Sequence, residues 1–478
     1  MEYKPKTLLK YWALFLFLCG LPLQSSSNNF LNQLKTKDVI KIKTEESCFC
    51  QLQGTIDDCT CQIDTETVDQ FNNYKVYPRL SSLLSKDYFR YFQVNLKRPC
   101  PFWDDDGSCS FEFCQVKTCR EEDVPAGLKG QRAKIKPFTA KDYSYGGNED
   151  CADEDLGSIN LTLSEETQAG FERWKVYDQS LVDFCTVKDE IDSDMQYVDL
   201  LLNPERYTGY KGPSAIRVWD AIYKENCFRS LGASNSLGPF GTDSSEEVCI
   251  EKRTFYRAIS GLHASINTHL SSKYLLSDSS GSLFKKGKPE PEWGLNVTEF
   301  LNHFEKPEAR KTGFPWLKNL YFLYLMELRA IWKASTFLRN FDLYTGNSED
   351  DADLKDAVKD LLTVVGNFPS HFDEKALFST KDSMKLRSEF HERFTNITRI
   401  MDCVGCQKCK LWGKLQVKGL GTALKILFSE PPNFTRGQQE FLSRNEIVAL
   451  FNAFGRLSES IHQLENFRRM IGPGGKGG

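Results

Sequence analysis

The sequence predicts a mainly α-helical protein: a single helical domain with a small cystine-rich N-terminal hairpin and a long mobile loop that bears cysteines. Three observations predict this. From residue 160 onward, apolar residues recur at helical spacing, and no alternation of strands and helices appears. Four cysteines flank a turn at 48–61. Residues 104–158 are rich in Gly, Lys, Asp and Glu and show little apolar periodicity, which is typical of a loop.

The helical core is expected to span residues 160–470. Apolar residues lie three or four positions apart in several long segments, so each would present one apolar face to a common core. Residues 70–103 show the same pattern, ending in "KRPCPFW", whereas 277–294 and 346–356 read as polar breaks. The segments with the clearest pattern are 165–178, 215–228, 251–276, 318–335 and 444–470.

The first 25 residues resemble a secretory signal peptide. Lys4, Lys6 and Lys10 precede the apolar run "YWALFLFLCGLPL", and small polar residues follow it. A retained signal anchor is the alternative, but no long apolar run continues. Cleavage would leave one domain, residues 26–478. The later segment 320–332 is apolar, but Glu327 interrupts it, so a buried amphipathic helix is expected and no spanning segment is found.

Composition excludes several classes of function. The formal net charge is −4, and no basic run or polybasic patch suggests a nucleic acid or a lipid surface as partner. Four Asn-x-Ser/Thr sequons agree weakly with secretion and are the candidate glycosylation sites: Asn160, Asn296, Asn396 and Asn433. The chain has 16 cysteines, and 15 remain once the signal peptide has carried Cys19 away, so at least one thiol lacks an intramolecular partner.

The first cysteine cluster is interpreted as structural. Nested bridges Cys48–Cys61 and Cys50–Cys59 would close a stapled hairpin over 48–61. A four-cysteine zinc knuckle is the alternative, but its C-x-C spacings are tighter than the usual C-x2-C, and an oxidising compartment favours disulfides.

Four further cysteines lie on the expected loop. Cys109, Cys114 and Cys119 are evenly spaced, and Cys151 follows in an acidic stretch. A mobile segment gains little from static bridges, although ordinary loop staples remain the alternative. The arrangement instead suits thiols that must reach two places.

The most informative motif is "DCVGCQKC" at residues 402–409. An iron–sulfur cluster usually needs a fourth thiolate, and a zinc site needs further ligands that the neighbourhood lacks. The C-x2-C spacing of Cys406 and Cys409 is that of thioredoxin-type dithiols. Cys403 would then pair with a distant partner, and Cys100, held between two prolines, is the predicted one. No metal site is predicted.

The sequence resembles the endoplasmic oxidoreductins, the flavin-dependent thiol oxidases of the endoplasmic reticulum. The resemblance runs from Cys48 to about Phe467. It is carried by "CFCQ" and "DDCTC" in 48–61 and by the segments 72–80, 87–103, 197–213, 255–270, 317–330, 400–428 and 446–456.

The resemblance implies a relay. Cys109 and Cys114 match the outer shuttle pair that accepts electrons from reduced protein disulfide isomerase, and Cys406 and Cys409 match the inner pair beside FAD. Electrons would then pass to FAD and to molecular oxygen, giving hydrogen peroxide. The family's regulatory cysteines match Cys119 and Cys151, with off-state bridges Cys109–Cys151 and Cys114–Cys119. Cys227 and Cys249 are expected to form a structural bridge, which leaves Cys185 as the odd thiol.

The resemblance also implies an FAD site within the helical bundle. A Rossmann signature is missing, because "GLGTAL" at 419–424 lacks the third glycine. The side chains at the matched positions are suited to a cofactor's phosphates, ring and polar atoms. Each could instead have a purely structural role, as part of a surface ion pair or as a core side chain. They are Arg206, Thr208, Trp219, Ser260 and His263.

One departure concerns the phosphate end of that site. The family often has two further arginines where this chain has His303 and Trp316, with Lys306, Arg310 or Lys311 as substitutes. The predicted function is an FAD-dependent thiol oxidase of the endoplasmic reticulum lumen, at most peripheral to the membrane. The alternative is a non-enzymatic, disulfide-rich luminal binding protein.

Overall fold

The structure of the chain is a computed structural model. It describes residues 73–100, 102, 115–129, 194–204, 218, 221–222, 250–277, 292–304, 313–366, 383–428 and 442–471. The expected signal peptide, the cystine hairpin at 48–61 and most of the loop at 104–158 lie outside these residues. So does the expected helix at 165–178.

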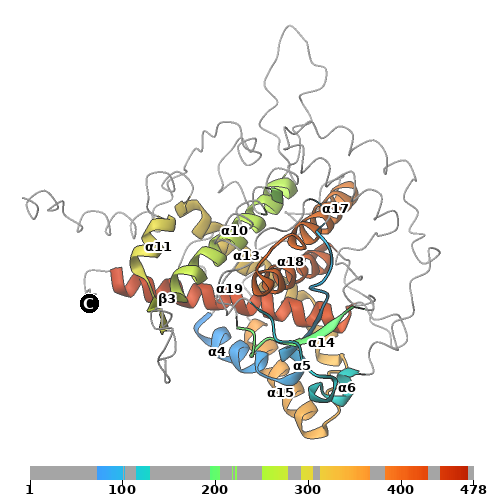
Figure 1. Cartoon of the computed structure of the whole chain (residues 1–478). Helices are drawn as coiled ribbons and strands as arrows, with labels where there is room; N and C mark the ends of the chain where they lie inside the picture. Colours follow the sequence, from blue (N-terminus) through green and yellow to red (C-terminus); the bar gives the residue numbers. More distant parts are fainter. Residues whose placement is uncertain are drawn as a thin grey trace, which may run out of the picture.

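Five long helices form the body of the protein (Figure 1). Helix α10 packs mainly against α13, and α18 mainly against α19, while α17 lies along α18. Their bounds are α10 Ile250–Ser272, α13 Gly313–Lys333, α17 Ser383–Met401, α18 Gln407–Phe428 and α19 Arg444–Ile471. The mainly α fold is therefore confirmed in the part of the chain that is described.

Small residues bring the paired helices together. A Cβ atom at Gly261 of α10 would collide with the carbonyl oxygen of Asn319 in α13. A Cβ atom at Gly419 of α18 would likewise meet the carbonyl oxygen of Ala449 in α19. Glycine is needed at these two positions because the helix backbones approach too closely for any side chain. The "GLGTAL" stretch thus packs inside a helix and forms no phosphate loop.

Helix α13 is the centre of the core, and it corrects the expectation of an amphipathic helix. Residues 319–328 are buried on every side, against α10, α18, α19 and α15 (Ser348–Val365). Glu327 is 1 % exposed, and burial raises the pKa of its carboxyl well above the ordinary value. No helix in the described part of the chain is both long enough and apolar enough to cross a membrane.

Shorter helices cover the core. Helix α4 (Asn73–Leu84) packs on α19 and α15, and α5 (Asp87–Arg90) follows it. The others are η3 Glu121–Asp123, α6 Ala126–Lys129, α11 Val297–Phe304 and α14 Ser335–Asn340. The polar break expected at 346–356 is instead the start of α15. Asn347 caps that helix by accepting a hydrogen bond from the Glu349 amide at 3.1 Å, and acidic residues in a first turn suit the helix dipole.

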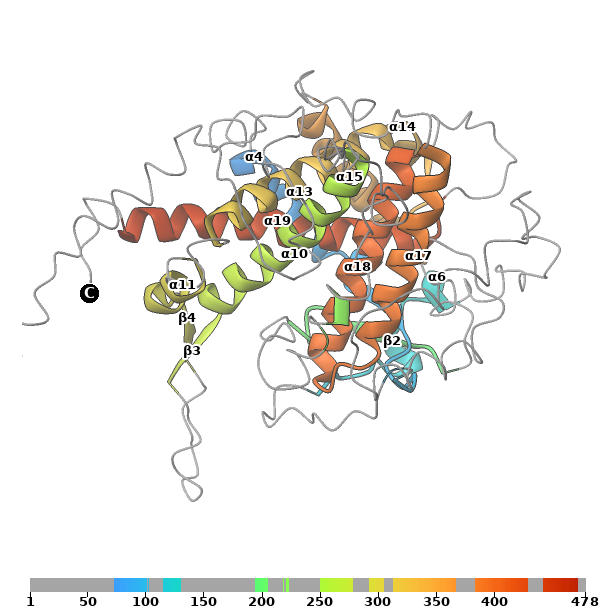
Figure 2. The ribbon, with the colours of Figure 1, turned by 90° about the horizontal axis from the view of Figure 1, so that it is seen from above.

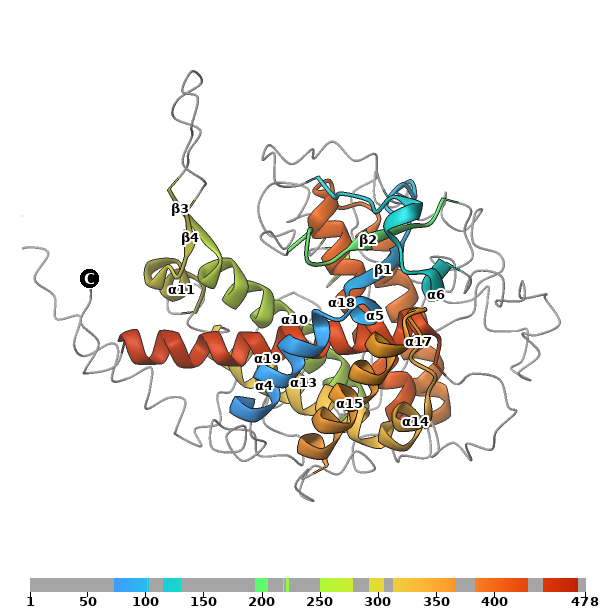
Figure 3. The same ribbon diagram turned by 90° about the horizontal axis from the view of Figure 1, so that it is seen from below.

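Two short antiparallel strand pairs also depart from the helices expected at 70–103 and 251–276. Strand β1 (Tyr91–Val94) pairs with β2 (Gln196–Asp199), and β3 (Tyr274–Ser277) pairs with β4 (Glu292–Gly294). Each first strand follows a helix directly and finds its partner later in the chain, so helical periodicity runs into it without a visible break. Figures 2 and 3 show β3 and β4 projecting from the helices, and β1 and β2 beside one end of α17 and α18.

Candidate active site

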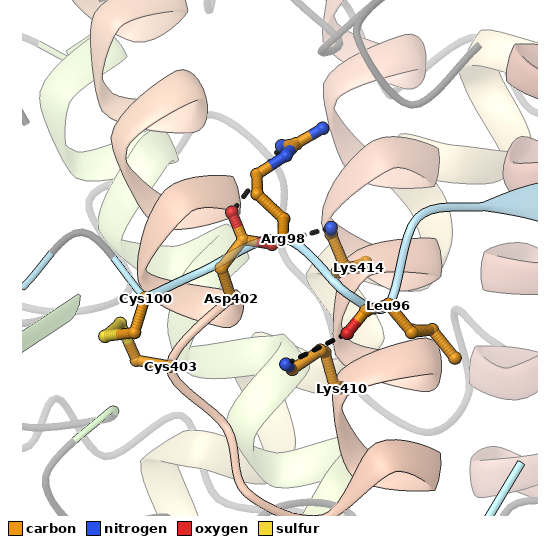
Figure 4. Close-up of a disulfide and its surroundings, with 7 residues drawn as sticks. All are labelled: Leu96, Arg98, Cys100, Asp402, Cys403, Lys410 and Lys414. Carbon is orange, nitrogen blue, oxygen red and sulfur yellow. Dashed lines mark hydrogen bonds and ion pairs between the residues drawn. A yellow bond between two sulfur atoms is a disulfide. The ribbon is translucent and has the colours of Figure 1, made fainter. Parts of the chain in front are cut away.

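A disulfide joins Cys100 to Cys403, as the sequence predicted (Figure 4). The two Cα atoms are 4.6 Å apart, although the residues are 303 positions apart in sequence. Cys403 is fully buried in the short turn between α17 and α18. The bridge therefore fixes that turn, which carries the C-x2-C motif, to the extended segment that follows β1.

Buried charges reinforce this junction. The Lys414 Nζ donates to Asp402 Oδ1 at 2.7 Å and to the Asn95 carbonyl at 3.0 Å. The Arg98 Nη1 lies 3.5 Å from Asp402 Oδ2, and Lys410 donates to the Leu96 carbonyl at 3.3 Å. Figure 4 shows these side chains between α18 and the segment 95–98, beside the disulfide. The lysines of α18 therefore bind the segment through its backbone.

Cys406 and Cys409 are both thiols in this structure, and they flank the start of α18. The Cys409 amide donates to Cys406 Sγ at 3.3 Å, which places Cys406 in the position of a helix N-cap. The pKa of Cys406 is lowered, chiefly by a hydrogen bond from the Cys409 side chain. Burial opposes the shift, and backbone amides and the Lys408 charge support it.

The two thiols differ in accessibility. Cys406 is half-buried, whereas Cys409 is 3 % exposed and faces the core. A lowered pKa increases the thiolate fraction of the more accessible sulfur and makes it a better leaving group. Cys406 is therefore the sulfur of this dithiol that an incoming thiol can reach.

Cys119 is the third free thiol among the described cysteines. Its amide donates to the Tyr197 carbonyl of β2 at 2.9 Å, and its side chain is half-buried. Burial, and secondarily the Asp199 charge, raises its pKa to about 11. This sulfur is thus a poor nucleophile in the state described.

Ser260 and His263, the described candidates for cofactor binding, lie one turn apart on α10. Ser260 is fully buried, and its Oγ accepts a hydrogen bond from Asn319 Nδ2 at 2.9 Å. The Asn319 Oδ1 in turn accepts from Arg257 Nε at 2.9 Å. These residues form one polar line across the α10–α13 contact.

His263 is neutral in this setting. Its side chain retains some contact with solvent, but the surrounding protein, and secondarily His303, lowers its pKa to about 3. His303 itself lies 3.3 Å from Glu299 on α11. The imidazole of His263 is therefore uncharged, with one donor and one acceptor nitrogen.

These residues suit the FAD that the resemblance implies. Neutral His263 and the Ser260 hydroxyl suit the uncharged polar atoms of a cofactor. Arg257 is 4 % exposed and its Nη1 has no hydrogen-bond partner among the described residues, so a cation is available beside them. The donor set fits the group. Arg206, Thr208 and Trp219 lie outside the described residues or side chains, and nothing is described of the Trp316 side chain.

Two of the four predicted glycosylation sites are described, and they differ in exposure. Asn396 lies inside α17 and is 8 % exposed. Asn296 is partly exposed, and its Oδ1 accepts from the Glu299 amide at 2.9 Å. Asn160 and Asn433 lie outside the described residues.

The other cysteines of the prediction lie outside the described residues: Cys48, Cys50, Cys59, Cys61, Cys109, Cys114, Cys151, Cys185, Cys227 and Cys249. No cluster of three or more metal-ligating side chains occurs within the described ranges.

Sequence reasoning missed the charges around the disulfide. Lys410, Lys414 and Lys418 recur every four residues within an otherwise apolar helix, and that spacing was a usable signal. Asp402 gave no such signal, because its partners come from α18 and from a segment some 300 residues earlier. The Asn319–Ser260 contact was equally invisible before α10 and α13 were paired.

Comparisons with known proteins agree with this geometry. A model of the family described as "Endoplasmic Reticulum Oxidoreductin 1 (ERO1)" matches residues 75–464. The "Ero1-like protein" of Drosophila melanogaster is 50 % identical over 453 residues, covering 90 % of this chain and 92 % of its own. The "ERO1-like protein alpha" of Homo sapiens is 48 % identical over 450 residues, covering 89 % and 92 %.

Solved structures of a more distant relative share the fold. One is described as "Structure of Ero1p, Source of Disulfide Bonds for Oxidative Protein Folding in the Cell". It matches with a TM-score of 0.53 and 28 % identity, covering 85 % of this chain and 98 % of its own. A crystal structure of an Ero1p mutant with two cysteines replaced by alanine matches with a TM-score of 0.51 and 29 % identity, covering 84 % and 98 %.

Proposed function

The chain belongs to the endoplasmic reticulum oxidoreductin 1 family, and from that premise we propose that it is a thiol oxidase that makes disulfides for the oxidative folding of other proteins. The observation that carries the proposal is the Cys406–Cys409 dithiol: a half-buried sulfur of lowered pKa at a helix start, one turn from a buried partner. We further propose that the protein works in the lumen of the endoplasmic reticulum.

The outer pair, Cys109 and Cys114, is proposed to deliver electrons to this dithiol. Cys114 lies two residues before Val116, whose amide donates to Gln407 between the inner cysteines at 3.2 Å. A chain of two residues spans at most about 7 Å, whereas a chain of seven residues spans up to about 25 Å. This supports Cys114 as the sulfur that meets Cys406 and Cys109 as the one that meets the protein substrate.

The internal exchange balances as two substitutions at sulfur. The Cys114 thiolate attacks Sγ of Cys406 in the oxidised inner pair, and the Cys406–Cys409 bond breaks with Cys409 as the leaving thiolate. The Cys109 thiolate then attacks Cys114, forming the outer disulfide and releasing Cys406 as a thiolate. The lowered pKa of Cys406 favours that release, because a more acidic thiol leaves faster.

FAD is the cofactor that we propose, because Ser260, neutral His263 and Arg257 suit it. When bound, it would supply a two-electron acceptor for the inner dithiol and a route to molecular oxygen, which would become hydrogen peroxide. Ser260 and His263 would hold its uncharged polar atoms, and Arg257 would offer a charge beside them. The protein substrate is proposed to be reduced protein disulfide isomerase or a related thioredoxin-fold protein.

The test is a visible spectrum of the purified luminal protein before and after anaerobic addition of a reduced dithiol. We expect a flavin spectrum that bleaches and returns with air. Cys406→Ala should abolish bleaching by any thiol, whereas Cys109→Ala should mainly abolish turnover with the isomerase. A Cys406→Ala protein that still oxidised the isomerase at the native rate would contradict the inner-pair assignment.

A second candidate function is a non-enzymatic luminal binding protein. One observation favours it: His303, which stands where the family often has an arginine, lies against Glu299 and so brings less net positive charge to a phosphate site. A colourless protein in the same measurement would select this candidate over the oxidase.

A further inference from the structure

We propose that Gln407, the residue next to Cys406 within the inner C-x2-C motif, is a positioning residue that holds the base of the shuttle segment over the inner dithiol. The inference rests on the proposed function. Gln407 carries no electrons in this proposal. Its role is to raise the frequency with which Cys114 meets Cys406.

The first step is that residues 116–119 are fixed one after another. Val116 N–H donates to Gln407 Oε1 at 3.2 Å, and Lys117 N–H donates to Asn203 Oδ1 at 2.8 Å. Thr118 forms a bridge with Val198 of β2, and Cys119 N–H donates to a carbonyl of the same strand at 2.9 Å. Four consecutive residues of this segment thus make contacts through the backbone.

The second step is that one side of this anchor is rigid. Asn203 is fully buried, and its Nδ2 donates to the carbonyls of Lys117 and Asp199, each at 2.9 Å. Its own carbonyl accepts a hydrogen bond from Trp412 Nε1 of α18 at 2.9 Å. The anchor is therefore tied to the first turns of the same helix that begins beside Cys406.

The third step is that, among the described residues of this segment, Val116 makes the hydrogen bond nearest in sequence to the shuttle cysteines, and Gln407 is its partner. The Gln407 side chain is exposed, so packing does not require a glutamine there. Without this hydrogen bond the nearest described fixed point moves from Val116 to Lys117, which adds one residue to the chain between Cys114 and that point. A longer tether lowers the effective concentration of one thiol at the other.

The test compares Gln407→Met, which keeps the length of the side chain but loses the acceptor, with the wild-type full-length holoprotein. The readout is the ratio of turnover with reduced protein disulfide isomerase to turnover with dithiothreitol. We expect this ratio to fall about fivefold, which corresponds to about 1 kcal/mol, the usual net worth of one hydrogen bond. Hydrogen exchange at the Val116 amide should become faster.

Three variants control this result. Gln407→Glu keeps an acceptor, and since its charge acts on Cys406 with either substrate, the ratio should return toward the wild-type value. In a protein lacking both Cys109 and Cys114, Gln407→Met should leave dithiothreitol turnover unchanged. Gln463→Met removes another glutamine that accepts a hydrogen bond, here from Asn466 at 3.2 Å on α19, and should not change the ratio.

An unchanged ratio for Gln407→Met would overturn the inference. So would a loss of dithiothreitol turnover in the protein without the shuttle pair, because Gln407 would then act on the dithiol itself. A wild-type protein that oxidises neither substrate would instead refute the proposed function, so the two failures are distinguishable.

Discussion

The buried carboxylate of Asp402 should be the most sensitive single site in the junction that holds the inner cysteines. Its side chain has no exposed surface, Lys414 lies 2.7 Å away and Arg98 3.5 Å away. Asp402→Ala removes the carboxylate that both Lys414 and Arg98 contact, and it leaves these two cations in a buried setting. Breaking a buried pair in this way typically costs 3–5 kcal/mol, so we expect the free energy of unfolding to fall by about 4 kcal/mol.

Lys414→Met should cost less. The carboxylate then still faces Arg98, and the main loss is the hydrogen bonds of Lys414 to Asp402 and to the Asn95 carbonyl. We expect a loss of about 2 kcal/mol. The double variant Asp402→Ala/Lys414→Met should cost less than the sum of the two, by about 1–3 kcal/mol, since the residues are in contact.

The assay is urea denaturation followed by tryptophan fluorescence, with the Cys100–Cys403 bridge intact. Asp360→Ala is the matched control, because the Asp360–Arg79 pair has a similar distance of 2.8 Å but lies at the surface. It should cost less than about 1 kcal/mol. The reasoning would be refuted if Asp402→Ala cost no more than this control, or if Lys414→Met cost more than Asp402→Ala.

Three further predictions concern the cysteines and His263. Replacing Cys100 and Cys403 by alanine removes the covalent link between residues 303 positions apart, which increases the entropy of the unfolded chain. The free energy of unfolding in denaturant titrations should therefore fall by up to about 5 kcal/mol. A change below about 1 kcal/mol would argue against a stabilising bridge. In the reduced protein, iodoacetamide should label Cys406 faster than Cys119 at pH 8, because the pKa of Cys406 is lowered and that of Cys119 is raised. Cys409→Ala should move the pH midpoint of Cys406 labelling upward, because the Cys409 side chain is the largest cause of the lowered pKa of Cys406; an unmoved midpoint would contradict this. The pKa of His263 is about 3 in the folded protein and about 6.5 when unfolded, so its contribution to stability is present above pH 6.5 and is lost as the pH falls toward 3. The variant His263→Gln should therefore show a flatter dependence of the free energy of unfolding on pH between these two values. Parallel profiles for the two proteins would show that His263 does not titrate in this way.

The cysteine chemistry was readable from the sequence because it is local. The spacing of Cys406 and Cys409 places both near the first turn of one helix, and that relation needs no knowledge of the rest of the fold. The long bridge was also predictable, because Cys403 was left over by the dithiol and Cys100 stood between two prolines. The long helices at α10, α13 and α19 followed from apolar spacing alone.

What the sequence left undecided depends on partners that are distant along the chain. Strand β1 continued a helical pattern until β2, about a hundred residues later, supplied its hydrogen bonds. Asp402 had no visible partner until α18 folded back across the segment 95–98, and the acidic run at 346–356 became a helix because Asn347 capped it and α15 could pack on α4 and α13. Sequence therefore determined the chemical groups and the helices that carry them, because these follow from local spacing. Tertiary structure alone decided the pKa shifts of Glu327 and His263 and the contact of Gln407 with Val116, because burial and contact distance exist only once segments far apart in sequence meet.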